Sequence, residues 1–282
     1  MTNAALRQEL LERGYVRLPN VLDAGLLEKL RQNTDAMLER QANFNAERHR
    51  TTGSMAHITI DPLFAELGAY PPALGALREL GYPHATFSDG YIISKPGHTP
   101  RLFWHYDWFA WEDPISFEQE PQQLFLMYYL TDTTRENGAL RAIPGSHHRH
   151  NPLHDLLSEP HSEALQRGTT LEKVEFSDRP DEVDLGVTAG DLLIGDARLL
   201  HASHANTTDA RRTLITLWYQ PHMSALPERL QAQIGAKTMQ APSSWPEEAR
   251  TLYDSVKTVY TGNAEPYGRS LYPRREAPEQ KA

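Results

Sequence analysis

The sequence predicts a mostly β protein with flanking helices, and three observations lead to that class. Before Ala85 the apolar residues recur at helical spacing. After Ala85 short β-prone runs alternate with turn signals, which is typical of a sandwich or a barrel. No stretch rich in Gly or Ser divides the chain, so we expect one domain over residues 1–282.

The first part of that domain, residues 1–84, is predicted to be a mainly helical flank. Leu6 and Leu10 share one face of a helix that ends at Gly14, a residue suited to the left-handed turn after a helix. Asp23 can cap the next helix, because its carboxylate can accept hydrogen bonds from the backbone N–H groups of the first turn.

The predicted β core covers residues 85–221 and carries an insertion over residues 147–180. Residues 222–282 are predicted as a helical cover that ends in a polar tail from Pro273. The strands that we expect are Ala85–Lys95, Leu102–Trp108, Leu124–Leu130, Ala139–Ile143, Glu172–Phe176, Asp184–Val187, Asp191–Ile194, Leu199–Ser203 and Thr213–Gln220.

The composition argues against several classes of function. With 28 basic and 37 acidic residues the formal net charge is -9, so we expect no nucleic-acid partner and no anionic membrane partner. There is no cysteine, which excludes disulfides, thiolate metal sites and cysteine nucleophiles. No stretch approaches the roughly 20 apolar residues of a membrane span. We therefore expect a cytoplasmic protein.

A candidate metal site starts at His105 and Asp107. Residues two apart on a strand point to the same side, so this imidazole and this carboxylate can bind one ion. The imidazole of His201 would complete a set of two neutral nitrogens and one anionic oxygen, which suits Fe(II) with open positions opposite. Arg212 could then hold an acidic co-substrate through a bidentate pair.

Each of these residues also has an ordinary structural explanation. The side chains of His105 and Asp107 can hydrogen-bond to each other inside the core. His201 can be a satisfied core histidine, and Arg212 can be a surface arginine at the start of a strand. A lone His-x-Asp pair is common and decides nothing by itself.

Ordered segments around these residues favour the metal site. They are Gly14–Leu22, Ser94–Pro96, Trp104–Trp108, Asn137–His147, Gly190–Leu193 and His201–Asn206, followed by Arg212. In this order and at this spacing, they resemble the phytanoyl-CoA dioxygenase family, within the Fe(II)/2-oxoglutarate oxygenases. The resemblance extends from about Gly14 to Pro221. Ala202 stands where the family usually has a glycine, which is a change between small residues.

The resemblance implies a double-stranded β-helix core, the cupin-like jelly roll, with helices packed outside. It implies Fe(II) bound by His105, Asp107 and His201, with 2-oxoglutarate as co-substrate and O2 as oxidant. Arg212 would pair with the distal carboxylate of 2-oxoglutarate, and Ser203 would supply a hydroxyl donor. Because related halogenases carry a small residue at the position of Asp107, the resemblance favours hydroxylation over halogen transfer.

Four further residues are candidates for the substrate site. Trp108 and Phe109 follow the candidate metal ligands directly, and Asp89 and Tyr91 lie on the preceding strand. Most aromatic residues of this region are expected to fill the core. We expect Lys95 to be solvated, because a lysine before a proline at a strand end usually is.

Histidines outside the candidate metal site have structural explanations. The cluster that begins at His147 could form a second metal or anion site, but we expect a solvated loop there. His147 itself is expected to fix the geometry of that loop. His204 would point away from His201 on a strand, so it is not counted as a ligand.

The leading functional hypothesis is a hydroxylase that oxidises an unactivated C–H bond of a small molecule in specialised metabolism, with release of succinate and CO2. Desaturation, epoxidation and cyclisation stay open, because they begin from the same oxidant. A second hypothesis keeps the chemistry but changes the substrate to a free amino acid, a compatible solute or an acyl thioester. A third is a non-catalytic jelly-roll protein that binds metal or a ligand. We assign no oligomeric state.

Overall fold

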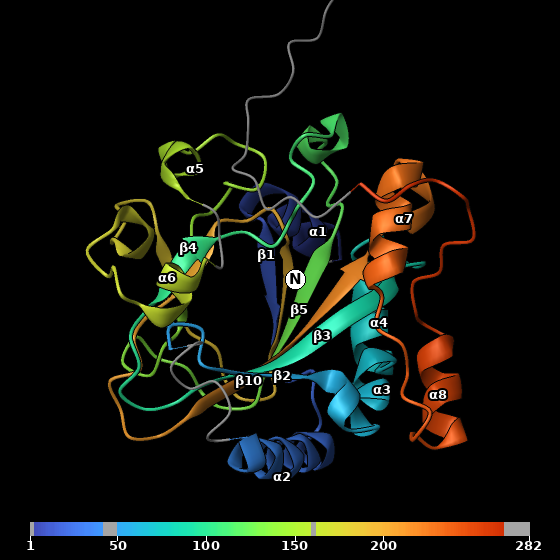
Figure 1. The fold of residues 1–282 in the computed structure, drawn as a ribbon, viewed down its shortest axis with the longest axis horizontal. Coiled ribbons are helices and arrows are strands. Elements are labelled where there is room, and N and C mark those ends of the chain that lie inside the picture. The colour runs from blue at the N-terminus through green and yellow to red at the C-terminus, as the bar shows by residue number, and fades with distance from the viewer. Residues whose placement is uncertain (1–2, 42–49, 159–161, 268–282) are drawn as a thin grey trace, which may run out of the picture.

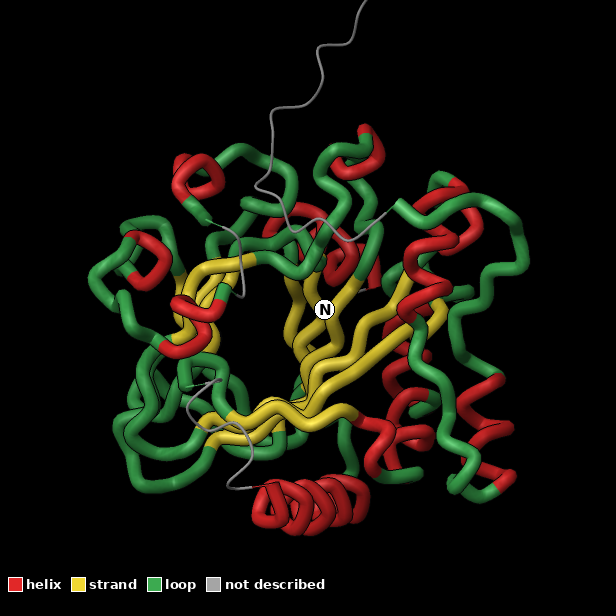
Figure 2. The backbone as a smooth tube through the Cα atoms, viewed as in Figure 1, coloured by secondary structure: helices red, strands yellow, loops and turns green. Residues whose placement is uncertain are grey.

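Two antiparallel β-sheets face each other in the protein, and helices pack around them (Figure 1). The structure is a computed structural model that describes residues 3–41, 50–158 and 162–267. The polar tail predicted from Pro273 lies outside the described residues. Figure 2 shows the strands of the two sheets as yellow tubes on opposite sides of the middle of the molecule.

The larger sheet has six strands in the order β1-β8-β5-β10-β3-β2. Its central strands are buried along nearly their whole length, because helices cover one face and the second sheet covers the other. In sheet order the strands are β1 Tyr15–Leu18, β8 Leu192–Asp196, β5 Leu124–Tyr129, β10 Arg212–Gln220, β3 Thr86–Lys95 and β2 Ser54–His57.

The smaller sheet has four strands in the order β4-β9-β6-β7. They are β4 Leu102–His105, β9 His201–Ser203, β6 Leu140–Ala142 and β7 Val183–Leu185. From β3 onward the chain crosses repeatedly between the two sheets, because β3, β5, β8 and β10 belong to one and β4, β6, β7 and β9 to the other. This is the topology of a double-stranded β-helix, and the predicted jelly-roll core is confirmed.

Side-chain alternation gives the larger sheet two different faces. Its outer face packs against the helices in a core cluster that includes Ile92 and Ile215. Its inner face meets the smaller sheet in another cluster, which includes Phe125, Leu214 and Leu140. A ligand held between the two sheets therefore contacts side chains of this inner face.

Helices cover the outer face of the larger sheet. In Figure 1, α2 lies below this sheet, and α3, α4, α7 and α8 lie to its right. The Asp23 carboxylate accepts a 2.9 Å hydrogen bond from the Leu26 amide and caps α2, as predicted. The helices are α1 Asn3–Arg13, α2 Ala24–Gln41, α3 Leu63–Gly68, α4 Pro71–Glu79, α5 Pro152–Leu156, α6 Glu163–Arg167, α7 Glu228–Lys237 and α8 Glu247–Asp254. Within the described ranges, none of them has the length and apolar character needed to cross a membrane.

A glycine turn joins the helical flank to the β core. Gly14 has a φ of +86°, and its carbonyl accepts a 2.8 Å hydrogen bond from the Asp196 amide. A Cβ on Gly14 would lie 2.6 Å from Nδ1 of His147, so a larger residue does not fit there. His147 Nε2 donates to the Leu11 carbonyl at 3.0 Å. His147 therefore has the loop-fixing role that the sequence predicts.

One predicted strand was wrong. Glu172–Phe176 does not form a strand, and its second half is a short 3-10 helix, η3 Val174–Phe176. Phe176 packs its ring against Phe103 at 6.3 Å between centroids. The alternation of apolar and polar residues in this segment resembles a strand pattern, but it extends over only one turn and serves a small local cluster.

Other boundaries also differ from the predictions. The strand expected over Leu102–Trp108 ends at His105, because the amides of Asp107 and Trp108 both donate to the Ala197 carbonyl and leave the strand ladder. The predicted helical flank, residues 1–84, also supplies two strands of the larger sheet, β1 and β2.

Candidate metal centre

The smaller sheet brings His105 and His201 side by side. They are register partners on β4 and β9, and their ring centroids are 4.2 Å apart. The register shifts between Leu102 and His105, and such an irregularity re-aims a side chain relative to a regular strand. Two imidazoles that are far apart in the sequence therefore point to one place.

Asp107 completes a group of three possible metal ligands. His105, Asp107 and His201 each offer one ligand atom, and these atoms all lie within 4.8 Å of one another. His105 Nε2 lies 3.8 Å from Asp107 Oδ1. Both imidazoles are buried, and the Asp107 side chain is 14% exposed. Two imidazoles and one carboxylate that leave the opposite positions open fit a mononuclear Fe(II) ion.

Both imidazoles are oriented by the same backbone contact. Nδ1 of His105 lies 3.0 Å from the Phe103 carbonyl, and Nδ1 of His201 lies 2.9 Å from the Leu199 carbonyl. A carbonyl oxygen only accepts, so Nδ1 carries the hydrogen in both rings and Nε2 carries the lone pair. Such second-shell bonds fix the tautomer that binds a metal through Nε2.

Asp107 is held by a residue that the sequence analysis missed. Trp218 Nε1 donates to Asp107 Oδ2 at 2.9 Å, which leaves Oδ1 as the oxygen nearer to His105. Trp218 lies on β10, six residues after Arg212. An even spacing places both side chains on the inner face of the larger sheet, so alternation alone would have indicated Trp218.

Two cations lie together at the other end of the same face. Arg212 of β10 is the register partner of Lys95 of β3, and their exposures are 4% and 0%. Among the described residues no carboxylate pairs with either, and Arg212 Nε has no hydrogen-bond partner. Burial lowers the pKa of Lys95 and that of Arg212, and the nearby Arg212 charge lowers the pKa of Lys95 further. A buried cationic pair of this kind fits a carboxylate ligand.

The prediction that Lys95 is solvated was wrong. Its Nζ donates to the Thr51 carbonyl at 2.8 Å inside the protein. The turn at Gly138 covers the lysine stem, and a Cβ on that glycine would lie 2.9 Å from Lys95 Cδ. Gly138 has a φ of +94°, so a glycine is needed there for both space and backbone conformation.

Two buried hydroxyls lie on the inner faces of the two sheets. Ser203, predicted to contact 2-oxoglutarate, is 2% exposed and is the register partner of the core residue Leu140. Thr216 lies on β10 between Arg212 and Trp218, and its buried Oγ1 has no hydrogen-bond partner among the described residues. A buried hydroxyl without a partner suits a polar ligand. Thr216 was not among the predicted site residues, although its even spacing from Arg212 indicates it.

The predicted substrate residues Asp89 and Tyr91 lie on the inner face of β3. Asp89 is the register partner of Trp218, and Tyr91 that of Thr216. His57, at the end of β2, pairs with Tyr91 in register and donates from Nε2 to Asp89 at 2.8 Å. His57 was not among the predicted site residues, because no strand was predicted there.

The other two predicted substrate residues lie elsewhere. Trp108 is fully buried in a core cluster that also contains Ala202. Ala202 follows His201 on β9, so its side chain points to the opposite face of the smaller sheet. Its Nε1 donates to Ser116 Oγ at 2.8 Å. Phe109 is half-buried and packs its ring 5.0 Å from that of Trp108. The structure thus places the Trp108 ring in the core.

A second group of possible metal ligands has other partners. Glu182, Asp184 and His204 each offer one atom within 4.8 Å of the others. Arg141 pairs with Glu182 at 2.5 Å, and Arg135 pairs with Asp184 at 3.2 Å. His204 Nε2 also lies 2.5 Å from Asp184. This ion-pair network satisfies the carboxylates without a metal.

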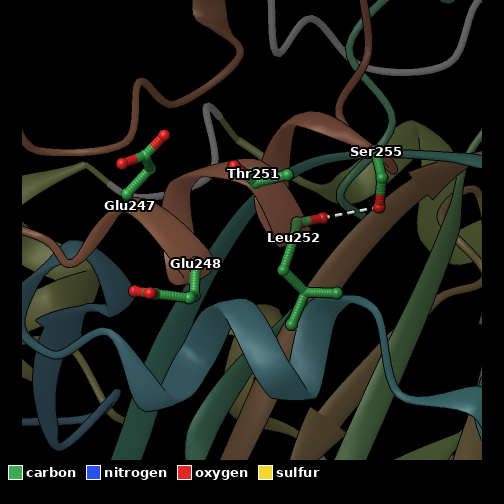
Figure 3. A pocket seen from close by; sticks show the side chains of 5 residues that line it. All are labelled: Glu247, Glu248, Thr251, Leu252 and Ser255. Carbon is green, nitrogen blue, oxygen red and sulfur yellow. Dashed lines mark hydrogen bonds between the residues drawn. The ribbon is translucent and has the colours of Figure 1, made fainter.

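A surface pocket on α8 is separate from the candidate metal centre. Figure 3 shows the five residues that line it, none of which is a predicted site residue: Glu247, Glu248, Thr251, Leu252 and Ser255. Tyr253 of the same helix belongs to the core cluster on the outer face of the larger sheet. The pocket therefore lies on the helix-covered side of that sheet.

Two features define the class of this protein: the two-sheet core, and the facial arrangement of two histidines and one aspartate. The class is that of jelly-roll proteins with a mononuclear non-haem iron site. Within that class, the chain belongs to the phytanoyl-CoA dioxygenase family, whose model matches residues 10–214. The family predicted from the ordered sequence segments is confirmed. Fe(II), 2-oxoglutarate and O2 are the cofactor and co-substrates of this family.

Individual relatives show how far the likeness extends. The phytanoyl-CoA dioxygenase domain-containing protein 1 homolog of Dictyostelium discoideum is 30% identical over 166 residues, 57% of this chain and 50% of that protein. Ectoine dioxygenase of Sphingopyxis alaskensis is 26% identical over 254 residues, 82% of this chain and 78% of that protein. HygX of Streptomyces hygroscopicus, solved with nickel and 2-oxoglutarate, shares the fold with a TM-score of 0.59 at 20% identity, over 77% of this chain and 86% of that one. The chain spans about half the length of the phytanoyl-CoA dioxygenase relatives.

Proposed function

We propose that the protein is an Fe(II)/2-oxoglutarate-dependent dioxygenase that hydroxylates an unactivated C–H bond of a small molecule in specialised metabolism. Its family and its fold support this function. The observation that carries it is the pairing of two features on facing sheets. Three convergent metal ligands lie on one side, and a buried arginine and lysine that pair with no carboxylate of the described residues lie on the other.

In this proposal His105, Asp107 and His201 hold Fe(II), and Arg212 pairs with the distal carboxylate of 2-oxoglutarate. Lys95 adds a second basic group beside Arg212. When bound, the iron, 2-oxoglutarate and O2 supply the oxidising chemistry, which converts 2-oxoglutarate to succinate and CO2 and inserts one oxygen atom into the substrate. The protein positions these groups and excludes water.

Other side chains have supporting roles. The Trp218 N–H holds one Asp107 oxygen and so fixes the direction of the carboxylate. Ser203, and Thr216 whose buried hydroxyl has no partner among the described residues, offer hydrogen bonds to the co-substrate. The carboxylate at Asp107 favours hydroxylation over halogen transfer, since halogenases of this type carry a small residue there.

The substrate is proposed to be a small molecule. The relative from Sphingopyxis alaskensis is by its name an ectoine dioxygenase, and it aligns with 82% of this chain. The alternative substrates, a free amino acid, a compatible solute or an acyl thioester, stay within the proposal. The single domain over residues 1–282 and the cytoplasmic location also stay predictions.

A spectroscopic experiment tests catalysis against mere metal binding. Anaerobic addition of Fe(II) and 2-oxoglutarate to the full chain should produce a visible charge-transfer absorption, because the co-substrate then chelates the iron. A non-catalytic jelly-roll protein that binds only metal would not show that band. Its absence would contradict the proposed function.

The co-substrate assignment is tested with two neighbouring arginines. Arg212→Ala removes one charge-assisted pair of about 2–5 kcal/mol, so the KM for 2-oxoglutarate should rise at least tenfold. Arg211→Ala is the matched control, because Arg211 contacts the hydroxyls of Ser54 and Ser94 instead. An unchanged KM for 2-oxoglutarate in Arg212→Ala would contradict the assignment of this residue.

A further inference from the structure

The inner face of the larger sheet is electrically polarised. Its cationic end is the register pair of Arg212 and Lys95. Its other end carries Asp89, which is the register partner of Trp218, whose N–H holds Asp107. Arg212 and Trp218 are six positions apart on β10, roughly 20 Å of strand. If an anionic co-substrate takes the cationic end, a substrate at the other end meets carboxylates.

The charge of Asp89 is not neutralised by its neighbours. Asp89 Oδ1 accepts from His57 Nε2 and from the Gly90 amide, both at 2.8 Å. His57 Nδ1 accepts a 3.2 Å hydrogen bond from the Thr59 amide, so the ring donates to Asp89 from Nε2. In the part of the chain that the structure describes, no lysine or arginine lies within ion-pair distance of Asp89.

Aromatic rings flank this carboxylate on the side of the metal ligands. The Tyr91 ring lies 5.0 Å from that of His57 and 6.0 Å from that of Trp218, in edge-on geometry. The side chains of Tyr91 and Trp218 are half-buried. The side chains of His57 and Asp89 are 33% and 30% exposed. We call these four residues, His57, Asp89, Tyr91 and Trp218, the acidic wall. Its partial exposure leaves it accessible to a ligand.

A carboxylate beside aromatic rings is the chemistry that binds an organic cation. The carboxylate supplies the opposite charge, and the ring faces attract positive charge through their quadrupoles. An anionic or purely hydrocarbon group would gain nothing from Asp89 and would lose the hydration of that carboxylate.

We propose that the acidic wall binds a positively charged nitrogen of the substrate, so that the substrate is a small molecule with an amine or ammonium group. The inference rests on the proposed function, because it takes the substrate to lie next to the metal ligands. Trp218 connects the two sites, since it pairs with Asp89 in register and donates to Asp107. A cation on the wall therefore sits one side chain away from a ligand of the iron.

The test uses matched compounds that differ in charge. The full chain, loaded with Fe(II) and 2-oxoglutarate, is given primary and secondary amines with their N-acetyl derivatives, and choline with its neutral isostere 3,3-dimethylbutan-1-ol. Succinate release is measured for each compound. We expect stimulation by cationic members, with at least tenfold lower kcat/KM for their neutral partners. Stimulation confined to neutral or anionic compounds, or by no cation at all, would overturn the inference.

The variant Asp89→Asn tests whether the charge of Asp89 causes the preference for cationic compounds. Asp89→Asn keeps the shape of the side chain and removes its charge, so the KM for the stimulating cation should rise at least tenfold. Asp209→Asn is the matched control, because Asp209 also faces a histidine, His98 Nε2, at 2.8 Å, but in an exposed position. A purely structural role of Asp89 would weaken the binding of the co-substrate as much as that of the cation, and this result would also overturn the inference.

The charge-transfer absorption separates this inference from the proposed function. A wild-type protein that shows the band but is not stimulated by cations contradicts only the acidic wall. A wild-type protein that lacks the band contradicts the proposed function itself.

Discussion

The indole N–H of Trp218 lies 2.9 Å from Oδ2 of Asp107 and joins the two sheets at the candidate metal centre. Trp218 comes from β10 of the larger sheet, whereas Asp107 follows β4 of the smaller one. A carboxylate that binds a metal through one oxygen needs a donor on the other to keep its direction. The contact therefore makes the orientation of a metal ligand depend on the packing of both sheets.

Trp218→Phe should weaken metal binding about 10- to 100-fold, the usual effect of removing a second-shell hydrogen bond. The ring is retained, so the change in packing is small. The measurement is the dissociation constant for Fe(II) or Co(II) under anaerobic conditions, by competition with a chelator.

Trp245→Phe is the control for that variant. Trp245 is also a buried tryptophan, and its Nε1 donates to the Thr59 carbonyl at 3.1 Å. It should lose a similar hydrogen bond without a change in metal affinity. Equal metal affinities in Trp218→Phe and Trp245→Phe would contradict the role given to Trp218.

Lys95→Met should have opposite effects on stability and on co-substrate binding. It removes a buried amine that pairs with no carboxylate in the part of the chain that the structure describes, so the ligand-free protein should unfold with a free energy larger by about 1 kcal/mol. It also removes one of two cations beside the expected dianion, so 2-oxoglutarate should bind about tenfold more weakly. Urea unfolding and 2-oxoglutarate titration measure these effects. Lys257→Met, which alters a partly exposed pair with Asp254, should show neither effect.

The same lysine gives a stability difference that depends on pH. Burial lowers the pKa of Lys95 in the folded protein, whereas an unfolded lysine titrates near a pH of about 10.4. Between these two values the unfolded state binds more protons, so the stability contributed by Lys95 rises as pH increases toward about 10.4. The stability advantage of Lys95→Met should shrink over that window. An advantage that is constant with pH would contradict a depressed pKa.

The buried His147 should lower the stability of the folded protein in mild acid. Burial lowers the pKa of His147 to about 4, against 6.5 for an ordinary histidine. The unfolded state therefore binds the extra proton first, and stability falls as pH decreases from 6.5 to about 4. The full loss is about 3 kcal/mol. His147→Gln keeps a donor for the Leu11 carbonyl and should show a correspondingly smaller loss.

Denaturant unfolding at a series of pH values measures this difference. His150→Gln is the matched control, because His150 is exposed and pairs with Asp155 at the surface. It should follow the wild-type curve. If His147→Gln also follows the wild-type curve, the acid sensitivity comes from other groups.

Gly195→Ala should disturb the candidate metal centre from the larger sheet. Gly195 is the register partner of Phe125, and a Cβ at Gly195 would overlap the Phe125 ring. That ring lies 5.4 Å from the ring of His201. Overpacking of this kind costs about 1–3 kcal/mol, and the displaced ring should also weaken metal binding.

The double variant Gly195→Ala with Phe125→Leu tests the cause. The leucine removes the outer ring atoms that the new methyl would overlap, so part of the lost stability and metal affinity should return. A double variant as impaired as the sum of both single changes would contradict the steric explanation.

The sequence predicted much of the site, because strand alternation and ordered segments are visible in it. His105, Asp107 and His201 converge as expected. Trp218 and Thr216 follow from Arg212 by even spacing along one strand, so they could have been predicted. His57 could not, since the short β2 forms only by pairing with β3. The burial of Lys95 likewise depends on distant segments, the Thr51 carbonyl and the turn at Gly138.

The register pairing of His105 with His201 also has a consequence for the order of folding and metal binding. During synthesis the histidine and aspartate of the first segment appear long before the second histidine joins them. Until the last strands close, the chain offers two of its three ligands and holds ferrous iron weakly. The complete ligand set therefore exists only once β4 and β9 have paired, so metal binding at full affinity is coupled to folding.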